Sequence, residues 1–292
     1  MTLLLHLVVS LSIFGPVFVS GNCFYCATPY LQNNWHLSGI PRSDPPKDIQ
    51  FHADCISPKK ESTTIKACTG ACAEIIFTTE RTVQVIRGCY ADLMGSDLGL
   101  VTAPAADSCD YVPLAADAAA EDLEVAATRF CYTTGETSCN NLLTSTTGKD
   151  TMTLLKCNLA TTMCVSCAKY DGKGKCTRSK EQKDQKVSVG NYCKKMEGKF
   201  GGHDYVERDA AIIAPFLGDN VCFDNTSFNV ISMKFGGINS TVTRAKRDVI
   251  EQFKGSVCYC KTSMCNSSNE LRATILPIVT SLIALLSALP LF

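Results

Sequence analysis

Histidine and tryptophan are scarce in this chain of 292 residues. The one tryptophan is Trp35, and the four histidines are His6, His36, His52 and His203. No Gly-x-Ser-x-Gly, His-Glu-x-x-His or phosphate-cradling glycine loop is present. His203 stands beside Asp204, but no nucleophile motif accompanies the pair. These absences predict a protein that is not an enzyme.

Neither positively nor negatively charged residues are in excess. The chain carries 28 Lys and Arg residues against 28 Asp and Glu residues. A balanced chain has no general attraction to polyanions, so we expect no nucleic-acid partner. The acidic segment 90–128 lacks the spacing of an EF-hand, and a solvated face is the favoured interpretation over a calcium site.

Cysteine, in contrast, is abundant. The 18 cysteines are an even number and make up about one residue in sixteen, which in a secreted protein indicates a disulfide framework. The Cys-x2-Cys pair of Cys23 and Cys26 leaves a redox or zinc site as less favoured alternatives, because no βαβ pattern follows and a zinc site needs reduced thiolates. We expect no metal and no cofactor.

The first 21 residues resemble a secretory signal. Residues 3–19 are almost wholly apolar, and Val19 and Gly21 fit the small-residue positions before a cleavage site. The mature chain is then expected to begin at Asn22. A first transmembrane helix is the alternative, and the Gly15-Pro16 pair disfavours it.

The C-terminal residues resemble a signal for attachment of a glycosylphosphatidylinositol (GPI) anchor. Residues 275–292 are apolar and uncharged, and no basic stop signal follows them. Small residues precede this run, which is the GPI pattern. We expect attachment at Ser267, with Asn266 as the second candidate. A retained membrane tail is the alternative.

A motif near the end of the chain carries a family resemblance. Cys258-Tyr259-Cys260 is followed by Cys265-Asn266, and a terminal Cys-x4-Cys-Asn with a cysteine just upstream resembles the closing signature of the Ly6/uPAR three-finger family. Cys131-Tyr132 and Cys139-Asn140 echo it, and each echo follows a segment with a helical pattern. Cys23 and Cys26 match the family's first two cysteines, and Arg87-Gly88-Cys89 matches the sixth.

The resemblance therefore covers the chain twice and implies a mainly β, disulfide-rich fold of two tandem three-finger domains. We expect a signal peptide at 1–21, domains at 22–140 and 157–266, a linker at 141–156 and a removed tail at 267–292. Residues 73–89, rich in Ile, Val and Thr, predict two strands joined near 79–82. Short helices are expected at 115–127 and 242–253.

The family's pairing order implies six disulfides: Cys23–Cys72, Cys26–Cys55, Cys68–Cys89, Cys164–Cys193, Cys167–Cys176 and Cys260–Cys265. The chain departs from the pattern at Tyr132, where a cysteine is expected, and its second copy lacks an equivalent of Cys68–Cys89 unless Cys222 is half of it. Three further pairs would use the remaining cysteines, although sequence alone does not determine them: Cys109–Cys131, Cys222–Cys258 and Cys139–Cys157.

Candidate contact residues lie on the loops. Trp35 and Tyr30 stand in the turn-rich segment 27–54, where they either contact a partner or cover a thin core. Segment 169–186 carries seven Lys or Arg residues against three Asp or Glu, and either meets an anionic glycan, lipid headgroup or acidic protein or is an ordinary solvated loop. Sequons at Asn225 and Asn239 predict glycosylation.

The resemblance implies a non-enzymatic recognition protein, GPI-anchored in the outer leaflet of the cell membrane, that binds or modulates a receptor, ion channel or other extracellular protein through its finger loops. Two alternatives stay open. One is an adhesive or structural coat protein of the cell surface. The other is a hydrolase, which would need a concave site that joins His203 to a nucleophile.

Overall fold

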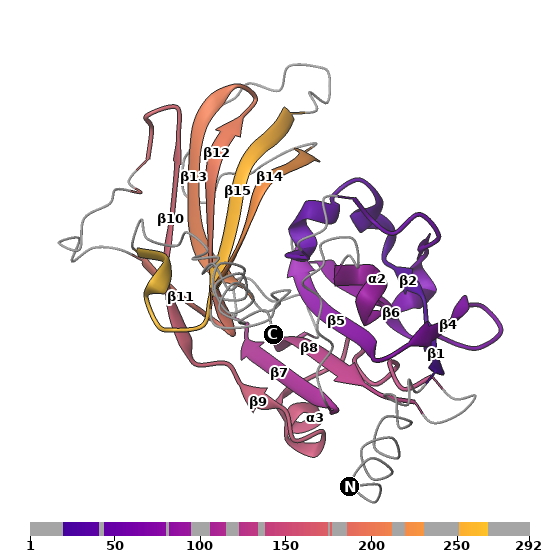
Figure 1. Cartoon of the computed structure of the whole chain (residues 1–292). Helices are drawn as coiled ribbons and strands as arrows, with labels where there is room; N and C mark the ends of the chain where they lie inside the picture. Colours follow the sequence, from indigo (N-terminus) through magenta and orange to yellow (C-terminus); the bar gives the residue numbers. More distant parts are fainter. Residues whose placement is uncertain are drawn as a thin grey trace, which may run out of the picture.

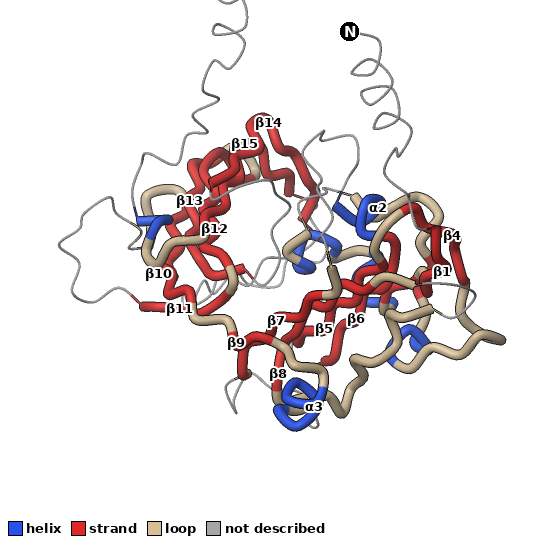
Figure 2. The backbone as a smooth tube through the Cα atoms, turned by 60° about the horizontal axis from the view of Figure 1, so that its bottom comes forward, coloured by secondary structure: helices blue, strands red, loops and turns tan. Residues whose placement is uncertain are grey.

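The computed structural model describes residues 20–40, 44–79, 82–94, 106–114, 123–133, 138–174, 176, 186–211, 220–230 and 251–267. Within these ranges the chain forms mainly β-strands, in two large sheets that Figures 1 and 2 show as separate groups of strands. The prediction of a mainly β, disulfide-rich fold is confirmed at this level.

The first sheet has seven described strands in the order β3-β2-β6-β5-β8-β7-β9, and β1 pairs with β4 beside it. The strands are β1 (Ser20–Phe24), β2 (Cys26–Ala27), β3 (Gln50–Phe51), β4 (Ile65–Thr69), β5 (Cys72–Thr79), β6 (Thr82–Cys89), β7 (Ser108–Pro113), β8 (Val125–Cys131) and β9 (Asn158–Leu159). Short helices accompany them: η1 (Pro29–Gln32), η2 (Trp35–Ser38), η3 (Ala53–Ile56), α2 (Tyr90–Met94) and α3 (Lys149–Leu154).

The second sheet has six described strands in the order β11-β10-β13-β12-β15-β14. They are β10 (Thr162–Tyr170), β11 (Lys186–Gly190), β12 (Tyr192–Phe200), β13 (His203–Ala211), β14 (Asn220–Val230) and β15 (Glu251–Cys260), and η5 (Cys265–Ser267) follows. The described chain therefore ends beside the second sheet.

The hairpin predicted for residues 73–89 is present. β5 and β6 pair antiparallel from Cys72↔Cys89 to Thr79↔Thr82, so the strands join where the sequence placed the turn. Their β-branched side chains favour a half-buried pleated surface. Ile75, Ile76 and Ile86 are buried in the cores of the first sheet.

The two predicted helices are not helical where the structure describes them. Residues 125–127 belong to β8, and residues 251–253 belong to β15. Residues 123–124 are described and are not helical, and residues 115–122 and 242–250 lie outside the described residues. β8 pairs with β5 on one side and β7 on the other, so its backbone groups are hydrogen-bonded across the sheet. Helix propensity is a weak preference that such tertiary pairing overrides.

Residues 141–156, which were expected to be a linker, pack on the first sheet. Leu143 and Met152 are fully buried in a cluster with Ile76 and Val85. β9, which follows this segment, pairs parallel with β7. At the other end, β1 begins at Ser20, two residues before the expected mature N-terminus.

All 18 cysteines form disulfides, as predicted. Seven of the bonds match the predicted pairs: Cys23–Cys72, Cys26–Cys55, Cys68–Cys89, Cys164–Cys193, Cys167–Cys176, Cys222–Cys258 and Cys260–Cys265. Two predicted pairs, Cys109–Cys131 and Cys139–Cys157, are wrong. The structure has Cys109–Cys157 and Cys131–Cys139 in their place.

The register of the strands explains the error. Cys131 lies opposite Cys72 across β5 and β8, and Cys260 lies opposite Cys193 across β12 and β15. Cys131 is therefore the counterpart of Cys260. The repeated Cys-Tyr dipeptide favours an alignment of Cys131-Tyr132 with Cys258-Tyr259, which is two residues out of register. With the correct alignment, each copy ends in a short local bridge, Cys131–Cys139 or Cys260–Cys265.

The asparagine after each local bridge makes the same hydrogen bonds in both copies. Asn140 Oδ1 accepts from Phe24 N at 2.9 Å, and its Nδ2 donates to Phe24 O and Ala73 O at 3.0 and 3.1 Å. Phe24 and Ala73 each follow a cysteine of the Cys23–Cys72 bond. Asn140 therefore joins the end of the first copy to its beginning.

Asn266 repeats this arrangement around the Cys164–Cys193 bond. Its Oδ1 accepts from Val165 N at 3.0 Å, and its Nδ2 donates to Val165 O and Lys194 O at 3.0 and 3.1 Å. Both asparagines are fully buried. The internal repeat is thus present in the hydrogen bonding as well as in the sequence.

Peptide mapping of the unreduced protein is expected to recover Cys109 linked to Cys157 and Cys131 linked to Cys139. Mass spectrometry after alkylation without reduction would identify the linked peptides. The Cys23–Cys72 peptide serves as a positive control. Recovery of a Cys109–Cys131 peptide from protein alkylated at low pH would contradict the structure.

Candidate functional site

A concave surface lies on one face of the second sheet. Side chains alternate along a strand, so β10, β12 and β13 each present two sets of residues. One set forms an apolar core that includes Met196, Phe200, Tyr205 and Phe253. The opposite set is mostly charged and lines a groove of about 700 Å³.

We call this surface the basic groove. Its charged lining residues are Lys169 on β10, Lys195, Glu197 and Lys199 on β12, and Asp204 and Arg208 on β13. Four positive groups against two negative ones leave two positive charges in excess. The strands hold these residues on one sheet, and Cys176, which is bonded to Cys167, also lines the groove.

Two of the positive groups are buried at the floor of the groove. Lys195 is 5% exposed and Arg208 is 2% exposed, and they lie directly opposite each other across β12 and β13. Facing residues at such positions have Cβ atoms about 5 Å apart, where like charges repel. Glu197 Oε2 lies 2.6 Å from Lys195 Nζ and offsets part of this charge. An anion entering the groove would offset more of it.

Charges on the opposite face of β12 are already balanced. Lys194 Nζ lies 2.9 Å from Glu207 Oε1, and Glu207 also accepts a hydrogen bond from Tyr205. Burial lowers the pKa of Lys194, but Glu207, together with Tyr259 and Asp209, outweighs this effect and holds that pKa above its usual value. Burial and then Glu207 raise the pKa of Tyr205. The excess of positive over negative lining residues is a feature of the basic groove.

The predicted basic segment 169–186 contributes only part of the groove. Lys169 lines it, whereas Lys175, Arg178, Lys180 and Lys183 lie outside the described residues. Lys195, Lys199 and Arg208 were missed. They lie on strands, up to 39 positions from Lys169 in the numbering, and only the strand pairing brings them to one face. The alternation in Lys195-Met196-Glu197 was the available signal.

His203 does not face the groove as part of an acid–base pair with Asp204. Its Nδ1 lies 3.3 Å from Asp171 Oδ1, and both side chains are more than half exposed. Its ring also packs edge-on against Tyr170, with centroids 5.5 Å apart. This is a surface contact at the turn between β12 and β13. Since every cysteine is bonded, no thiol is present as a nucleophile.

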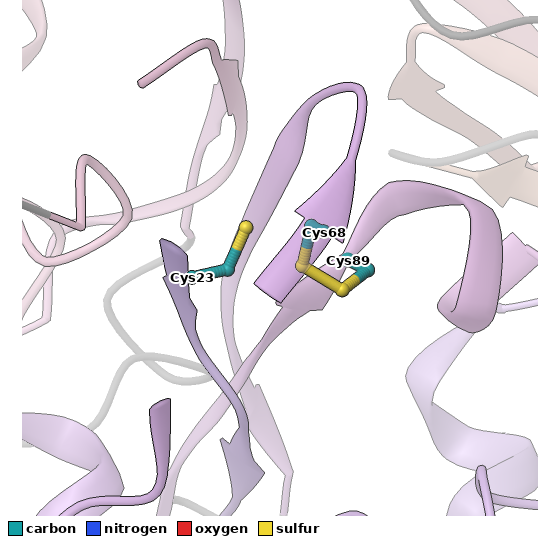
Figure 3. A group of neighbouring side chains, drawn as sticks. All are labelled: Cys23, Cys68 and Cys89. Carbon is teal, nitrogen blue, oxygen red and sulfur yellow. A yellow bond between two sulfur atoms is a disulfide. The ribbon is translucent and has the colours of Figure 1, made fainter. Parts of the chain in front are cut away.

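A cluster of three sulfur atoms has the spacing of a metal site. Cys23, Cys68 and Cys89 bring their sulfurs within 4.8 Å of one another, as Figure 3 shows. However, Cys68 is bonded to Cys89, and Cys23 is bonded to Cys72. Metal ligation requires thiolates, so this cluster is a pair of neighbouring disulfides.

Trp35, a predicted contact residue, belongs to the core. It is 3% exposed, packs with Leu31 and Ile49, and meets Phe51 edge-on at 6.4 Å between ring centroids. The helices η1 and η2 fold the predicted loop back on the sheet, which buries the ring. Of the two roles that the sequence leaves open for Trp35, the core role is confirmed and the surface contact is wrong, and Tyr30 packs partly buried against the same core.

The predicted glycosylation and anchor-attachment sites lie in different parts of the chain. Asn225 lies in β14, Asn239 lies outside the described residues, and Ser267 ends η5. Asn266-Ser267-Ser268 is a third sequon, but the buried Nδ2 of Asn266 already donates to Val165 and Lys194, so Asn266 is unsuitable for a glycan. Among the residues that the structure describes, no helix is long and apolar enough to span a membrane, and the apolar run 275–292 lies outside them.

The chain was compared with protein-family models, curated proteins and solved structures, and none of them matches.

Proposed function

We propose that this protein is a non-enzymatic recognition protein of the outer cell surface that holds an acidic group of its partner in the basic groove. The observation that carries the proposal is the burial of Lys195 beside Arg208 on a groove floor with excess positive charge. Desolvated, fixed positive groups bind anions more strongly than solvated ones. The partner is therefore an extracellular molecule bearing sulfate or carboxylate groups.

The dimensions of the groove favour a chain-like ligand over a single ion. A space of about 700 Å³ lies within the usual range for sites that enclose small organic molecules. Lys169 and Lys199, on β10 and β12, also line the groove and would contact further acidic groups. An anionic glycan or an acidic stretch of a receptor or channel has this repeated charge.

The cell-surface location is the second part of the proposal. It is supported by the apolar residues 3–19, the small residues at 266–269 and the apolar run 275–292. Nine disulfides among the 18 cysteines also suit an oxidising compartment. The repeated cysteine pairs and asparagine hydrogen bonds support membership of the Ly6/uPAR family, with two three-finger copies.

Reversing charge at the groove is expected to weaken binding to an immobilised sulfated polysaccharide by about tenfold for Lys169→Glu and for Lys199→Glu. Both residues are at least partly exposed, so folding should survive. Surface plasmon resonance at several salt concentrations would measure the change. The loss should shrink as salt rises, because exposed charges are screened.

Lys60→Glu is the matched control, since it changes net charge equally on an exposed turn of the first unit. A polyglutamate surface in place of the polysaccharide separates an acidic protein ligand from a glycan. Failure of the parent protein to bind either surface, or equal losses in all three variants, would reject the basic groove as the binding site.

A further inference from the structure

Exposed apolar side chains gather on one border of the molecule. Five of the seven exposed large hydrophobic residues in the described chain fall between residues 154 and 189: Leu154, Leu159, Met163, Val187 and Val189. We call these five the apolar rim. Leu154 is 81% exposed and the others are about half exposed. In Figure 1 their elements α3, β9 and β11 follow one another along the lower edge of the molecule.

The strand register makes part of the apolar rim continuous. Met163 on β10 lies directly opposite Val189 on β11, and Val187 lies two residues along β11 on the same face. β11 is the last described strand on its side of the sheet. Val187, Val189 and Met163 therefore form an exposed apolar strip on one face of this edge of the sheet.

The described chain ends at this rim. Met264 N donates to Met163 O at 2.6 Å, and Met163 N donates to Ser263 Oγ at 3.3 Å. Ser267 N then donates to Met264 O at 3.0 Å, within η5. Ser267, the proposed anchor residue, is therefore one helical turn from the residue bonded to Met163.

Exposed lysines lie close to these apolar residues in the sequence. Lys156 lies between Leu154 and Leu159, Lys186 precedes Val187, and Lys261 follows β15; all three are exposed. Lysines near exposed apolar residues suit the boundary between lipid headgroups and acyl chains, since a lysine stem can lie along apolar surface while its charge stays in water.

We infer that the apolar rim contacts the outer leaflet of the membrane when the chain is anchored at Ser267. The inference rests on the anchor in the proposed function. A lipid attached next to η5 holds the adjoining surface at the bilayer. The attachment therefore gives the apolar rim a high effective concentration at the membrane. Weak insertion of a few side chains is then enough for lasting contact. The basic groove, on the same sheet, would stand near the membrane surface.

Tryptophan fluorescence tests this contact on the full-length protein purified from cell membranes. Trp35 is the only native tryptophan and is buried, so it serves as an internal reference. Val189→Trp and Val187→Trp each place a second ring on the apolar rim. Leu37→Trp is the matched control, because Leu37 is an exposed apolar residue of the first unit. Each protein is reconstituted in phosphatidylcholine vesicles with or without brominated acyl chains.

Brominated lipid is expected to quench the added rim tryptophan by about half, since quenching requires contact with the upper acyl chains. The parent and Leu37→Trp should be quenched little. A rim tryptophan that stays unquenched in vesicle-bound protein overturns the inference, as does its burial in a cross-linked dimer. Ethanolamine labelling and release by a phosphatidylinositol-specific lipase test the anchor separately. Quenching without either signal would keep the membrane contact and reject the glycolipid.

Discussion

Replacing Arg87 by methionine is expected to lower the free energy of unfolding by about 3–5 kcal/mol, because it leaves the buried carboxylate of Glu74 without its main partner. Both side chains are fully buried and face each other across β5 and β6. Arg87 also donates to Cys55 O at 2.8 Å and to Asn140 O at 2.6 Å. Urea unfolding followed by Trp35 fluorescence would measure the loss.

The double variant Glu74→Leu/Arg87→Met provides the sharper comparison. It removes both charges, so it should be more stable than Arg87→Met alone. Arg129, whose Nη1 lies 3.4 Å from Glu74, keeps some charge nearby in the single variant and limits its loss. Lys60→Met, at an exposed position, should change stability little. A loss below about 1 kcal/mol in Arg87→Met would contradict the importance of this pair.

The second large effect is expected at the paired asparagines. Asn140→Ala and Asn266→Ala should each cost about 3 kcal/mol or more, because each leaves several buried backbone groups without a hydrogen bond. In the first copy these groups are Phe24 N, Phe24 O and Ala73 O. The two losses should be similar, since the two bond sets are alike.

Asn141→Ala is the control for Asn140, because it removes the same side chain from the next, exposed position. Unfolding in urea and the yield of secreted protein would both be measured. A stable Asn140→Ala protein with unchanged unfolding would show that the bond set contributes little. Unequal losses at Asn140 and Asn266 would show that the two copies do not depend on it equally.

Local signals in the sequence predicted the parts of the fold that depend on nearby residues. The run of β-branched residues at 73–89 predicted β5 and β6 and their turn. Cysteine spacing and the family resemblance predicted seven of the nine disulfides. The buried Glu74–Arg87 ion pair could not be predicted from the sequence, because nothing at either residue indicates its partner until the register of the two strands is known.

The errors arose where tertiary pairing outweighs local preference. The Ala-rich residues 125–127 favour a helix in isolation, yet they occupy a strand held on both sides. The repeated Cys-Tyr dipeptide suggested an alignment that strand register contradicts at Cys131. Trp35 was equally suited to a loop tip and to a core, and only the fold of η1 and η2 decides between them. The basic groove depends on side-chain direction across three strands.

The Cys109–Cys157 bond has a consequence for the order of events during synthesis. The chain emerges from its N-terminus, and the first copy receives its closing Asn140 before Cys157 has been made. At that moment nine cysteines are present, an odd number, and Cys109 is the one whose partner is missing. Cys157 is made 17 residues later, so until then the Cys109 thiol is available for exchange with neighbouring disulfides. Cys164 is made seven residues after Cys157, so correct oxidation requires Cys109 to bond with Cys157 and not with Cys164.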